Sequence, residues 1–174
     1  GLIGKGKGAA IGAAVGAAVG TGAGVAIGHK MDKKAAEAAK IEGAQVEQVT
    51  DANGLPAVKV SFAAGILFGF NSAALSNEAK ASLRELAQIL KEDPTTDIAI
   101  IGHTDNRGSD AVNNPLSVNR ADATRDYLVT RGVLLSRIGI DGRGSREPIA
   151  TNSTEAGRAQ NRRVEIFVAE AAPK

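Results

Sequence analysis

The sequence contains no cysteine and no tryptophan, and aromatic residues make up only 3% of its 174 residues. The absence of cysteine excludes disulfide bonds, thiol catalysis and thiolate metal sites. With only two histidines in the chain, a histidine-rich metal site is excluded as well. The net charge of +2 is too small to indicate a nucleic-acid-binding protein. Because hydrophobic residues still amount to 43%, we expect a folded domain with an aliphatic core.

The residue types are distributed unevenly and divide the chain into three regions. Residues 1–28 hold ten of the 21 glycines and no acidic residue, and the stretch from Gly8 to Gly28 carries no charge. Residues 29–53 are rich in lysine and acidic residues, whereas residues 54–174 have the composition of an ordinary globular domain. We therefore expect an N-terminal segment, a charged helical linker and one folded domain, with these boundaries.

Glycine recurs every four residues in the first region, at positions 4, 8, 12, 16, 20, 24 and 28. In a helix these glycines form one slowly winding groove, and such a groove lets helices approach closely in a membrane. We expect this glycine-zipper helix to associate with lipid or with another helix, including a second copy through Gly12, Gly16 and Gly20. A flexible linker and a leftover signal-peptide core remain as alternatives. The charged residues 30–42 are expected to continue as a helical stalk leaving the membrane.

The chain begins at Gly1 rather than at methionine. We therefore expect that an upstream segment has been removed. The sequence leaves open whether that segment carried a signal peptide or a lipidated cysteine, as in a lipoprotein.

Hydrophobic periodicity and turn signals in the third region predict alternating strands and helices. The predicted elements are a hairpin of strands 45–50 and 56–62, helix 77–92, strand 97–101, helix 114–131, strand 138–140, helix 155–161 and strand 163–169. Ser76 or Asn77 is expected to cap the first helix, and Asn113 or Asn114 the second, with Pro115 in its first turn. This order predicts an α/β fold, an α+β two-layer sandwich with the order β-α-β-α-β-(α)-β.

The loop from Gly102 to Asn114 is the candidate binding loop. It follows a buried strand and precedes a helix, where α/β sheets place their ligands. Asp105 lies in this loop, and Arg120 lies one to two turns into the helix, from where its long side chain can reach back. Such a pair suits a zwitterion, because the carboxylate binds an ammonium and the guanidinium binds a carboxylate. A structural salt bridge between the two residues is the alternative.

Five blocks of sequence, in order within residues 58–168, carry a resemblance to a known family. They are Gly102-His103-Thr104-Asp105, then Asn113-x-x-Leu116-Ser117-x-x-Arg120-Ala121, then Arg137-Ile138 with Gly142-x-Gly144, then Pro148, and finally Asn161-Arg162-Arg163-Val164-Glu165-Ile166. They resemble the OmpA C-terminal, peptidoglycan-binding family, which includes the Pal lipoprotein and the flagellar stator protein MotB. A glycine zipper followed by this domain is similar to a subgroup of small outer-membrane proteins and lipoproteins.

The resemblance implies an OmpA-like domain that binds peptidoglycan noncovalently, through the meso-diaminopimelate of the stem peptide. Asp105 and Arg120 match the ligand-binding pair of the family. Asn113 matches the polar loop residue, Thr104 lies beside the ligand, and Arg162 matches an arginine at the rim of the site. The sequence departs from the family at Gly69, where many members carry an acidic residue after the first-strand phenylalanine, Phe68. Asn71 is a candidate to compensate.

The function expected from the resemblance is that of a binding module that tethers the outer membrane to the cell wall. The domain would lie in the periplasm of a Gram-negative envelope, with peptidoglycan and outer-membrane lipid as partners and without cofactor or nucleic acid. One alternative is a stator-like or oligomeric membrane assembly anchored to the wall. An enzyme that modifies peptidoglycan is disfavoured, because no serine has a histidine base pattern. A metal site at His103 and a nucleotide loop at Gly142-x-Gly144 are disfavoured as well.

Overall fold

The computed structural model describes residues 29–50, 56–69 and 71–170. The glycine-zipper segment and the expected turn at residues 51–54 lie outside the described residues. The elements are α2 (His29–Ala38), β1 (Gln45–Thr50), β2 (Pro56–Ala63), α3 (Ala64–Leu67), α4 (Asn77–Glu92), β3 (Thr96–His103), α5 (Asp110–Thr130), a short 3-10 helix (Leu135–Arg137), β4 (Ile138–Gly142), α6 (Glu155–Asn161) and β5 (Arg163–Glu170).

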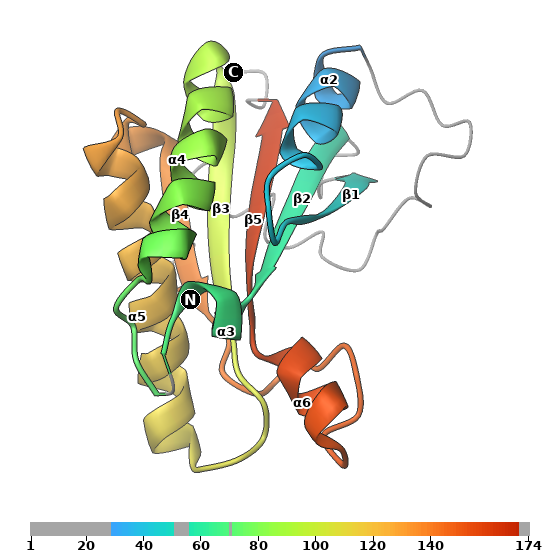
Figure 1. Ribbon diagram of the computed structural model, residues 1–174, viewed down its shortest axis with the longest axis vertical. Helices are drawn as coiled ribbons and strands as arrows, with labels where there is room; N and C mark the ends of the chain where they lie inside the picture. Colours follow the sequence, from blue (N-terminus) through green and yellow to red (C-terminus); the bar gives the residue numbers. More distant parts are fainter. Residues whose placement is uncertain (1–28, 51–55, 70, 171–174) are drawn as a thin grey trace.

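The strands form one five-stranded sheet in the order β1-β2-β5-β3-β4. The last strand of the sequence, β5, lies at the centre and runs antiparallel to both β2 and β3, while β4 runs parallel to β3. Helices α2, α4 and α5 lie on one face of this sheet (Figure 1). This is the α/β fold with a helical layer that the sequence predicts, and the predicted hairpin of β1 and β2 is confirmed.

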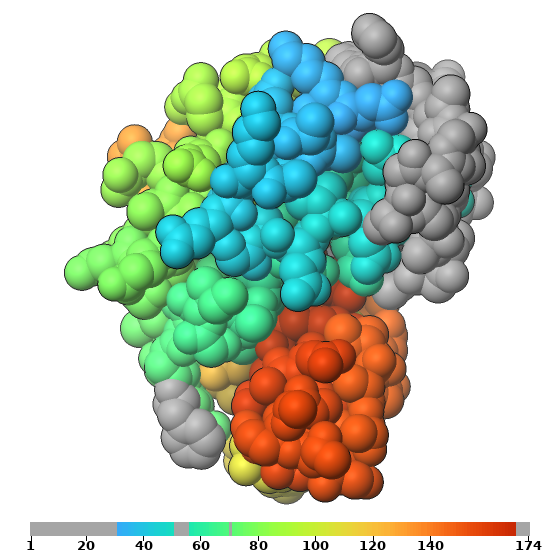
Figure 2. Space-filling view, turned by 45° about the vertical axis from the view of Figure 1, so that its right-hand side comes forward, coloured from blue at the N-terminus to red at the C-terminus, as the bar shows by residue number. Residues whose placement is uncertain are grey.

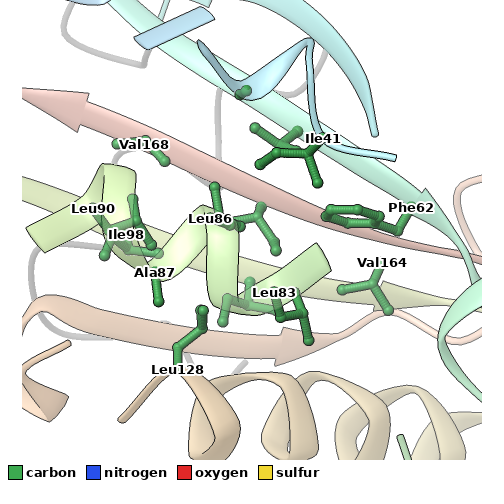
Figure 3. Close-up of a cluster of buried hydrophobic side chains, with 14 of the residues drawn as sticks. Ile41, Phe62, Leu83, Leu86, Ala87, Leu90, Ile98, Leu128, Val164 and Val168 are labelled. Atoms are coloured by element: carbon green, nitrogen blue, oxygen red, sulfur yellow. The ribbon is translucent and has the colours of Figure 1, made fainter. Parts of the chain in front are cut away.

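The main core lies between the sheet and the helical layer (Figure 3). Helix α4 spans the residues predicted for it, and the Ser76 hydroxyl caps it by accepting a hydrogen bond of 3.0 Å from the Ala79 N–H. Leu83, Leu86 and Leu90 recur at helical spacing and are buried against the sheet. The interior position predicted for strand 97–101 is confirmed, because every residue of β3 is buried.

Helix α5 begins earlier than the sequence predicts. It starts at Asp110 after the N-cap residue Ser109, whereas the expected start was at residue 114 with an asparagine cap. Pro115 lies inside the helix, where it cannot donate the hydrogen bond of a backbone N–H and its ring crowds the carbonyl of the preceding turn. An acidic residue in the first turn favours the earlier start, because it interacts favourably with the helix dipole. The binding loop is therefore shorter than expected, and Asn113 lies on the helix.

Phe68 does not belong to the first strand of the domain. Strand β2 ends at Ala63, and one turn of helix, α3, follows it directly. Phe68 comes after this turn and forms an isolated β-bridge with Leu75.

The described part of residues 29–53 does not form a separate charged linker or stalk. The helix α2 and the turn after it place four apolar side chains in the main core, namely Met31, Ala35, Ala38 and Ile41. The buried Lys34 forms an ion pair of 3.0 Å with Asp93 at the end of α4. Strand β1 pairs with β2 along its whole length. Because most charged residues of α2 lie outside its buried face, where Lys34 is paired with Asp93, the composition of the helix conceals an apolar face.

Two glycines let α5 approach the sheet closely. A Cβ atom on Gly102 of β3 would lie 2.1 Å from the backbone oxygen of Ser117, and one on Gly142 of β4 would lie 2.4 Å from the backbone nitrogen of Val118. Both distances are far below van der Waals contact, so neither position accepts a side chain without moving the helix. This close approach fixes the first half of α5 over the ends of β3 and β4.

A chain that starts at residue 54, the domain boundary expected from the sequence, should be much less stable than one that starts at His29. The shorter chain loses the buried side chains Met31, Ile41 and Val49. Each such side chain contributes roughly 1.5–3 kcal/mol, so we expect a loss on the order of 5 kcal/mol in the free energy of unfolding. Urea denaturation of both chains measures this difference. Equal denaturation midpoints with equal slopes would show that α2 and β1 are dispensable.

Candidate ligand-binding site

Several loops converge at one end of the sheet, where β2, β3 and β4 end and β5 begins. The register places Ala63 and His103 on either side of Arg163, so that the loops after β2 and β3 meet the start of β5. The α6 region (orange to red) forms the lower lobe in the space-filling view (Figure 2). A cleft of about 780 Å³ lies at this end. All five site residues expected from the sequence line it, namely Thr104, Asp105, Asn113, Arg120 and Arg162.

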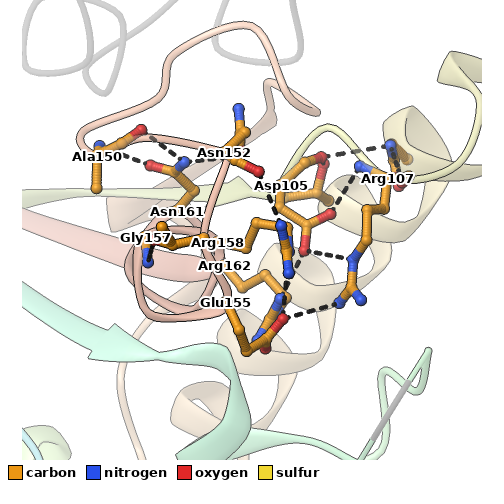
Figure 4. A network of polar contacts seen from close by, with 12 residues as sticks. Asp105, Arg107, Ala150, Asn152, Glu155, Gly157, Arg158, Asn161 and Arg162 are labelled. Carbon is orange, nitrogen blue, oxygen red and sulfur yellow. Dashed lines mark hydrogen bonds and ion pairs between the residues drawn. The ribbon is translucent and has the colours of Figure 1, made fainter.

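The Asp105 carboxylate lies in the cleft with only 5% of the residue exposed. Its Oδ1 accepts a hydrogen bond of 2.9 Å from the backbone N–H of Arg107. Its Oδ2 contacts two guanidiniums, Arg162 Nη1 at 2.6 Å and Arg107 Nε at 3.4 Å (Figure 4). Arg162 precedes β5 directly, so the contact joins two segments that are 57 residues apart in the sequence.

The surroundings of Asp105 favour its charged form. Burial raises the pKa of the carboxyl group, whereas the hydrogen bonds from the Arg162 side chain and the Arg107 backbone lower it. The charges of both arginines act in the same direction, and the pKa of Asp105 is lowered below its ordinary value. Asp105 is therefore an anion at neutral pH.

Arg120 reaches the cleft from α5 and is also 5% exposed. Its Nε donates to the Ser72 carbonyl at 3.0 Å and its Nη2 to the Gly69 carbonyl at 3.4 Å. The guanidinium carbon lies over the Phe68 ring, 5.2 Å from the ring centroid. Among the ion pairs of the described residues, none involves Arg120. The structural salt bridge with Asp105, which the sequence left open, is thus not formed.

A buried guanidinium without a carboxylate partner has a clear electrostatic consequence. Burial lowers the pKa of Arg120, and the nearby charge of Arg162 lowers it further, while Asp105 opposes both effects. Arginine remains protonated nonetheless, because its ordinary pKa is above 12. The cleft therefore holds a desolvated cation that an anion entering from solvent would stabilise.

Thr104 and Asn113 shape the loop that carries Asp105. The Thr104 hydroxyl donates to the Asp105 carbonyl at 2.9 Å. The backbone N–H of Thr104 donates to the Gly144 carbonyl, also at 2.9 Å. Asn113 Nδ2 donates to the Arg107 carbonyl at 2.9 Å and to the Asp105 carbonyl at 3.5 Å. These hydrogen bonds hold the backbone on both sides of Asp105 and so orient its carboxylate.

At Gly69, where many members of the family carry an acidic side chain, a backbone carbonyl contacts Arg120 instead. The Gly69 carbonyl accepts from Arg120, and Asn71 also lines the cleft, with a left-handed φ of 51°. Asparagine tolerates this conformation better than most residues. Asn71 therefore stays a candidate for a compensating polar group in the cleft.

Sequence reasoning missed two charged residues at the mouth of the cleft, Arg107 and Glu155. Glu155, the first residue of α6, contacts Arg162 at 2.6 Å, Arg158 at 3.2 Å and Arg107 at 3.8 Å (Figure 4). The only sequence signal was a charged residue in the binding loop and an acid seven residues before Arg162. Neither signal indicates contact across 48 residues of chain.

A buried ion cluster joins β2, β3 and β5. The fully buried Glu165 carboxylate contacts His103 Nε2 at 2.9 Å, Arg163 Nε at 3.1 Å and Lys59 Nζ at 3.1 Å. Burial raises the pKa of Glu165, but these three partners together lower it well below its ordinary value. His103 thus forms a structural hydrogen bond, and its pKa is lowered by burial. Within the described ranges, no group of three or more histidine or acidic side chains is arranged to hold a metal ion.

Comparisons with known proteins show the family to which the chain belongs. A family model described as the OmpA family matches residues 67–162, which is more than half of the chain. The probable lipoprotein YiaD of Escherichia coli is 40% identical over 141 residues, which cover 80% of this chain and 63% of YiaD. The peptidoglycan-binding protein ArfA of Mycobacterium tuberculosis is 48% identical over 103 residues, which cover 59% of this chain and 32% of ArfA.

A solved structure shows the same fold. The cell wall anchor of the T6SS from Pseudomonas aeruginosa is similar with a TM-score of 0.67 and 31% identity, over 80% of this chain and 96% of that one. The chain spans only about a third of ArfA and less than two thirds of YiaD. In the part of the chain that the structure describes, no helix has the length and hydropathy needed to cross a membrane.

The Asp105 carboxyl group should titrate below the ordinary aspartate pKa of about 3.9. Arg162→Gln should raise this pKa, because it removes a hydrogen bond and a charge that favour the ionised form. The part of the folding stability that this shift supplies is lost as the pH falls through the lowered pKa. Carboxyl chemical shifts recorded by NMR from neutral to acidic pH measure both values.

Arg158→Gln is the matched control for this titration, because Arg158 contacts Glu155 but makes no contact with Asp105. An Asp105 titration that is the same in the Arg162→Gln variant as in the unchanged protein would contradict the electrostatic assignment.

Proposed function

Because the chain belongs to the OmpA family, we propose that its described domain binds peptidoglycan noncovalently, through the diaminopimelate of the stem peptide. ArfA is named as a peptidoglycan-binding protein and the T6SS protein as a cell wall anchor, so association with the cell wall is the function these relatives support. The proposal requires binding alone, with no bond made or broken, and needs no cofactor.

The observation that carries the proposal is the pair of opposite charges in one cleft. Arg120 is buried without a carboxylate partner among the described residues, and Asp105 lines the same cleft as an anion. Diaminopimelate presents an ammonium and a carboxylate on one carbon. The carboxylate would bind the Arg120 guanidinium with two hydrogen bonds, and the ammonium would bind Asp105. Thr104 and Asn113 hold the loop in position, and Arg162 lies at the rim.

The wider role we propose is to connect the outer membrane to the wall. YiaD is described as a probable lipoprotein, and an outer-membrane porin F of Pseudomonas aeruginosa is 42% identical to this chain over 121 residues. These relatives support a place in the cell envelope, with the domain facing the periplasmic peptidoglycan. The glycine-zipper segment would supply contacts with outer-membrane lipid or with a second copy through Gly12, Gly16 and Gly20.

Asp105→Ala and Arg120→Ala should each weaken peptidoglycan binding by about 2–5 kcal/mol, or roughly 30-fold to several thousand-fold. Each change removes one partner and leaves the opposite charge of the ligand desolvated and unpaired. Arg120→Lys should recover little, because an ammonium cannot form the two parallel hydrogen bonds of a guanidinium. The measurement is sedimentation with purified peptidoglycan, with and without free diaminopimelate as competitor.

Asp122→Ala and Arg125→Ala are the controls, because these residues pair with each other on α5 and do not line the cleft. Both controls should bind normally. Thermal melting of all variants separates lost binding from lost folding. Normal binding by a folded Asp105→Ala or Arg120→Ala variant would remove that residue from the site.

A further inference from the structure

Four charged side chains form a closed ring at the mouth of the cleft. Asp105 contacts Arg162 at 2.6 Å and Arg107 at 3.4 Å, and Glu155 contacts the same two arginines at 2.6 and 3.8 Å. Figure 4 shows the two carboxylates on either side of the shared guanidiniums. The ring joins the loop after β3 to the first residue of α6, and all four side chains line the cleft.

The ring places two cations where the ammonium of the proposed ligand has to bind. The Oδ2 atom of Asp105 is occupied by Arg162, and the Oδ1 atom already accepts a backbone hydrogen bond from Arg107. An incoming ammonium has to replace or crowd the Arg162 guanidinium. Because Glu155 holds the other terminal nitrogen of Arg162, that guanidinium keeps a carboxylate partner when it leaves Asp105.

The balance of charge in the cleft also indicates a role for Glu155. Three guanidiniums, those of Arg107, Arg120 and Arg162, face two carboxylates, those of Asp105 and Glu155. Without Glu155 the excess of positive charge would double. A cleft with that excess would favour a carboxylate and disfavour an ammonium, so it would distinguish an amino acid from a simple acid less well.

We propose that Glu155 is a specificity-determining residue that makes the cleft selective for ligands carrying an ammonium group, by sharing Arg162 and Arg107 with Asp105. This inference rests on the proposed binding of diaminopimelate. Glu155 acts on the ligand through the two arginines and through its charge, and is a positioning residue for Arg162. The pKa of Glu155 is lowered chiefly by the hydrogen bond from Arg162, so its carboxylate is charged at neutral pH.

A purely structural role for Glu155 makes a different prediction. Glu155 lies in the first turn of α6 and also pairs with Arg158, so it could serve only to stabilise that helix. Its side chain is 59% exposed, and exposed pairs contribute little to stability. A structural role would change the melting temperature and weaken all ligands alike, without altering the preference for an ammonium.

The test compares two small ligands on the full chain, diaminopimelate and pimelate, which is the same dicarboxylate without the two amino groups. The ratio of the two dissociation constants, obtained by NMR titration at neutral pH, reports the contribution of the ammonium. Glu155→Gln should lower this preference for diaminopimelate by about two- to fivefold. Arg162→Gln should raise it, because it removes the cation that competes for Asp105. Glu155→Asp keeps the charge and should restore part of the preference.

Arg158→Gln is the matched control, since it removes another partner of Glu155 and leaves the ring intact. Its preference should equal that of the unchanged protein. If the unchanged protein prefers diaminopimelate and folded Glu155→Gln has the same preference, the role of Glu155 is refuted while the proposed function stands. If the unchanged protein binds both ligands equally or neither, the proposed function fails, and the inference fails with it.

Discussion

The pairing of β5 between β2 and β3 is the constraint on which the binding site depends. The strand comes last in the sequence and lies in the middle of the sheet, antiparallel to both neighbours. This arrangement brings Arg162, just before β5, against Asp105, just after β3. Without the central strand, the loop after β3 and the helix α6 would have no fixed relation to each other. The site is thus a product of topology rather than of any local motif.

The buried ion cluster around Glu165 reinforces this pairing. Glu165 of β5 binds His103 at the end of β3 and Lys59 of β2, so one buried carboxylate ties the three central strands together. A buried carboxylate is costly to desolvate unless it is fully paired, as it is here. Because His103 directly precedes Thr104 and Asp105 in the chain, the cluster anchors the end of β3 from which the loop starts.

The sequence predicted most of the fold where local patterns were strong. The prediction of helix 77–92 was correct because its leucines recur at helical spacing and Ser76 caps the helix. The predicted start of α5 was wrong. A proline is typical of the first turn of a helix, whereas in the structure Pro115 lies inside the helix, which starts at Asp110. The described part of residues 29–53 was misjudged because the buried face of α2 consists of a few small or medium apolar side chains in a helix with many charged residues.

The five expected site residues do lie together, but their contacts were not predictable from spacing. The sequence offered Asp105 and Arg120 as two poles for a ligand, with a direct salt bridge between them as the alternative. In the described part of the chain, Asp105 pairs with Arg162 and Arg107, whereas Arg120 donates to carbonyls and lies over an aromatic ring. The role of Glu155 was invisible because it arises from α6 folding back over the loop after β3. Long-range contacts of this kind depend on tertiary structure and leave no periodic signal in one sequence.

The placement of the cleft also determines how the domain would carry mechanical load. Helix α2 begins toward the end of the sheet opposite the cleft and α6 (Figure 1). A pull between the start of α2 and a ligand held by Arg120 and Asp105 therefore runs along the strands. Antiparallel hydrogen bonds lie perpendicular to the strands, so such a force loads many of them in shear at once instead of opening them one by one. A sheet loaded in this direction resists separation better than one whose hydrogen bonds open in sequence.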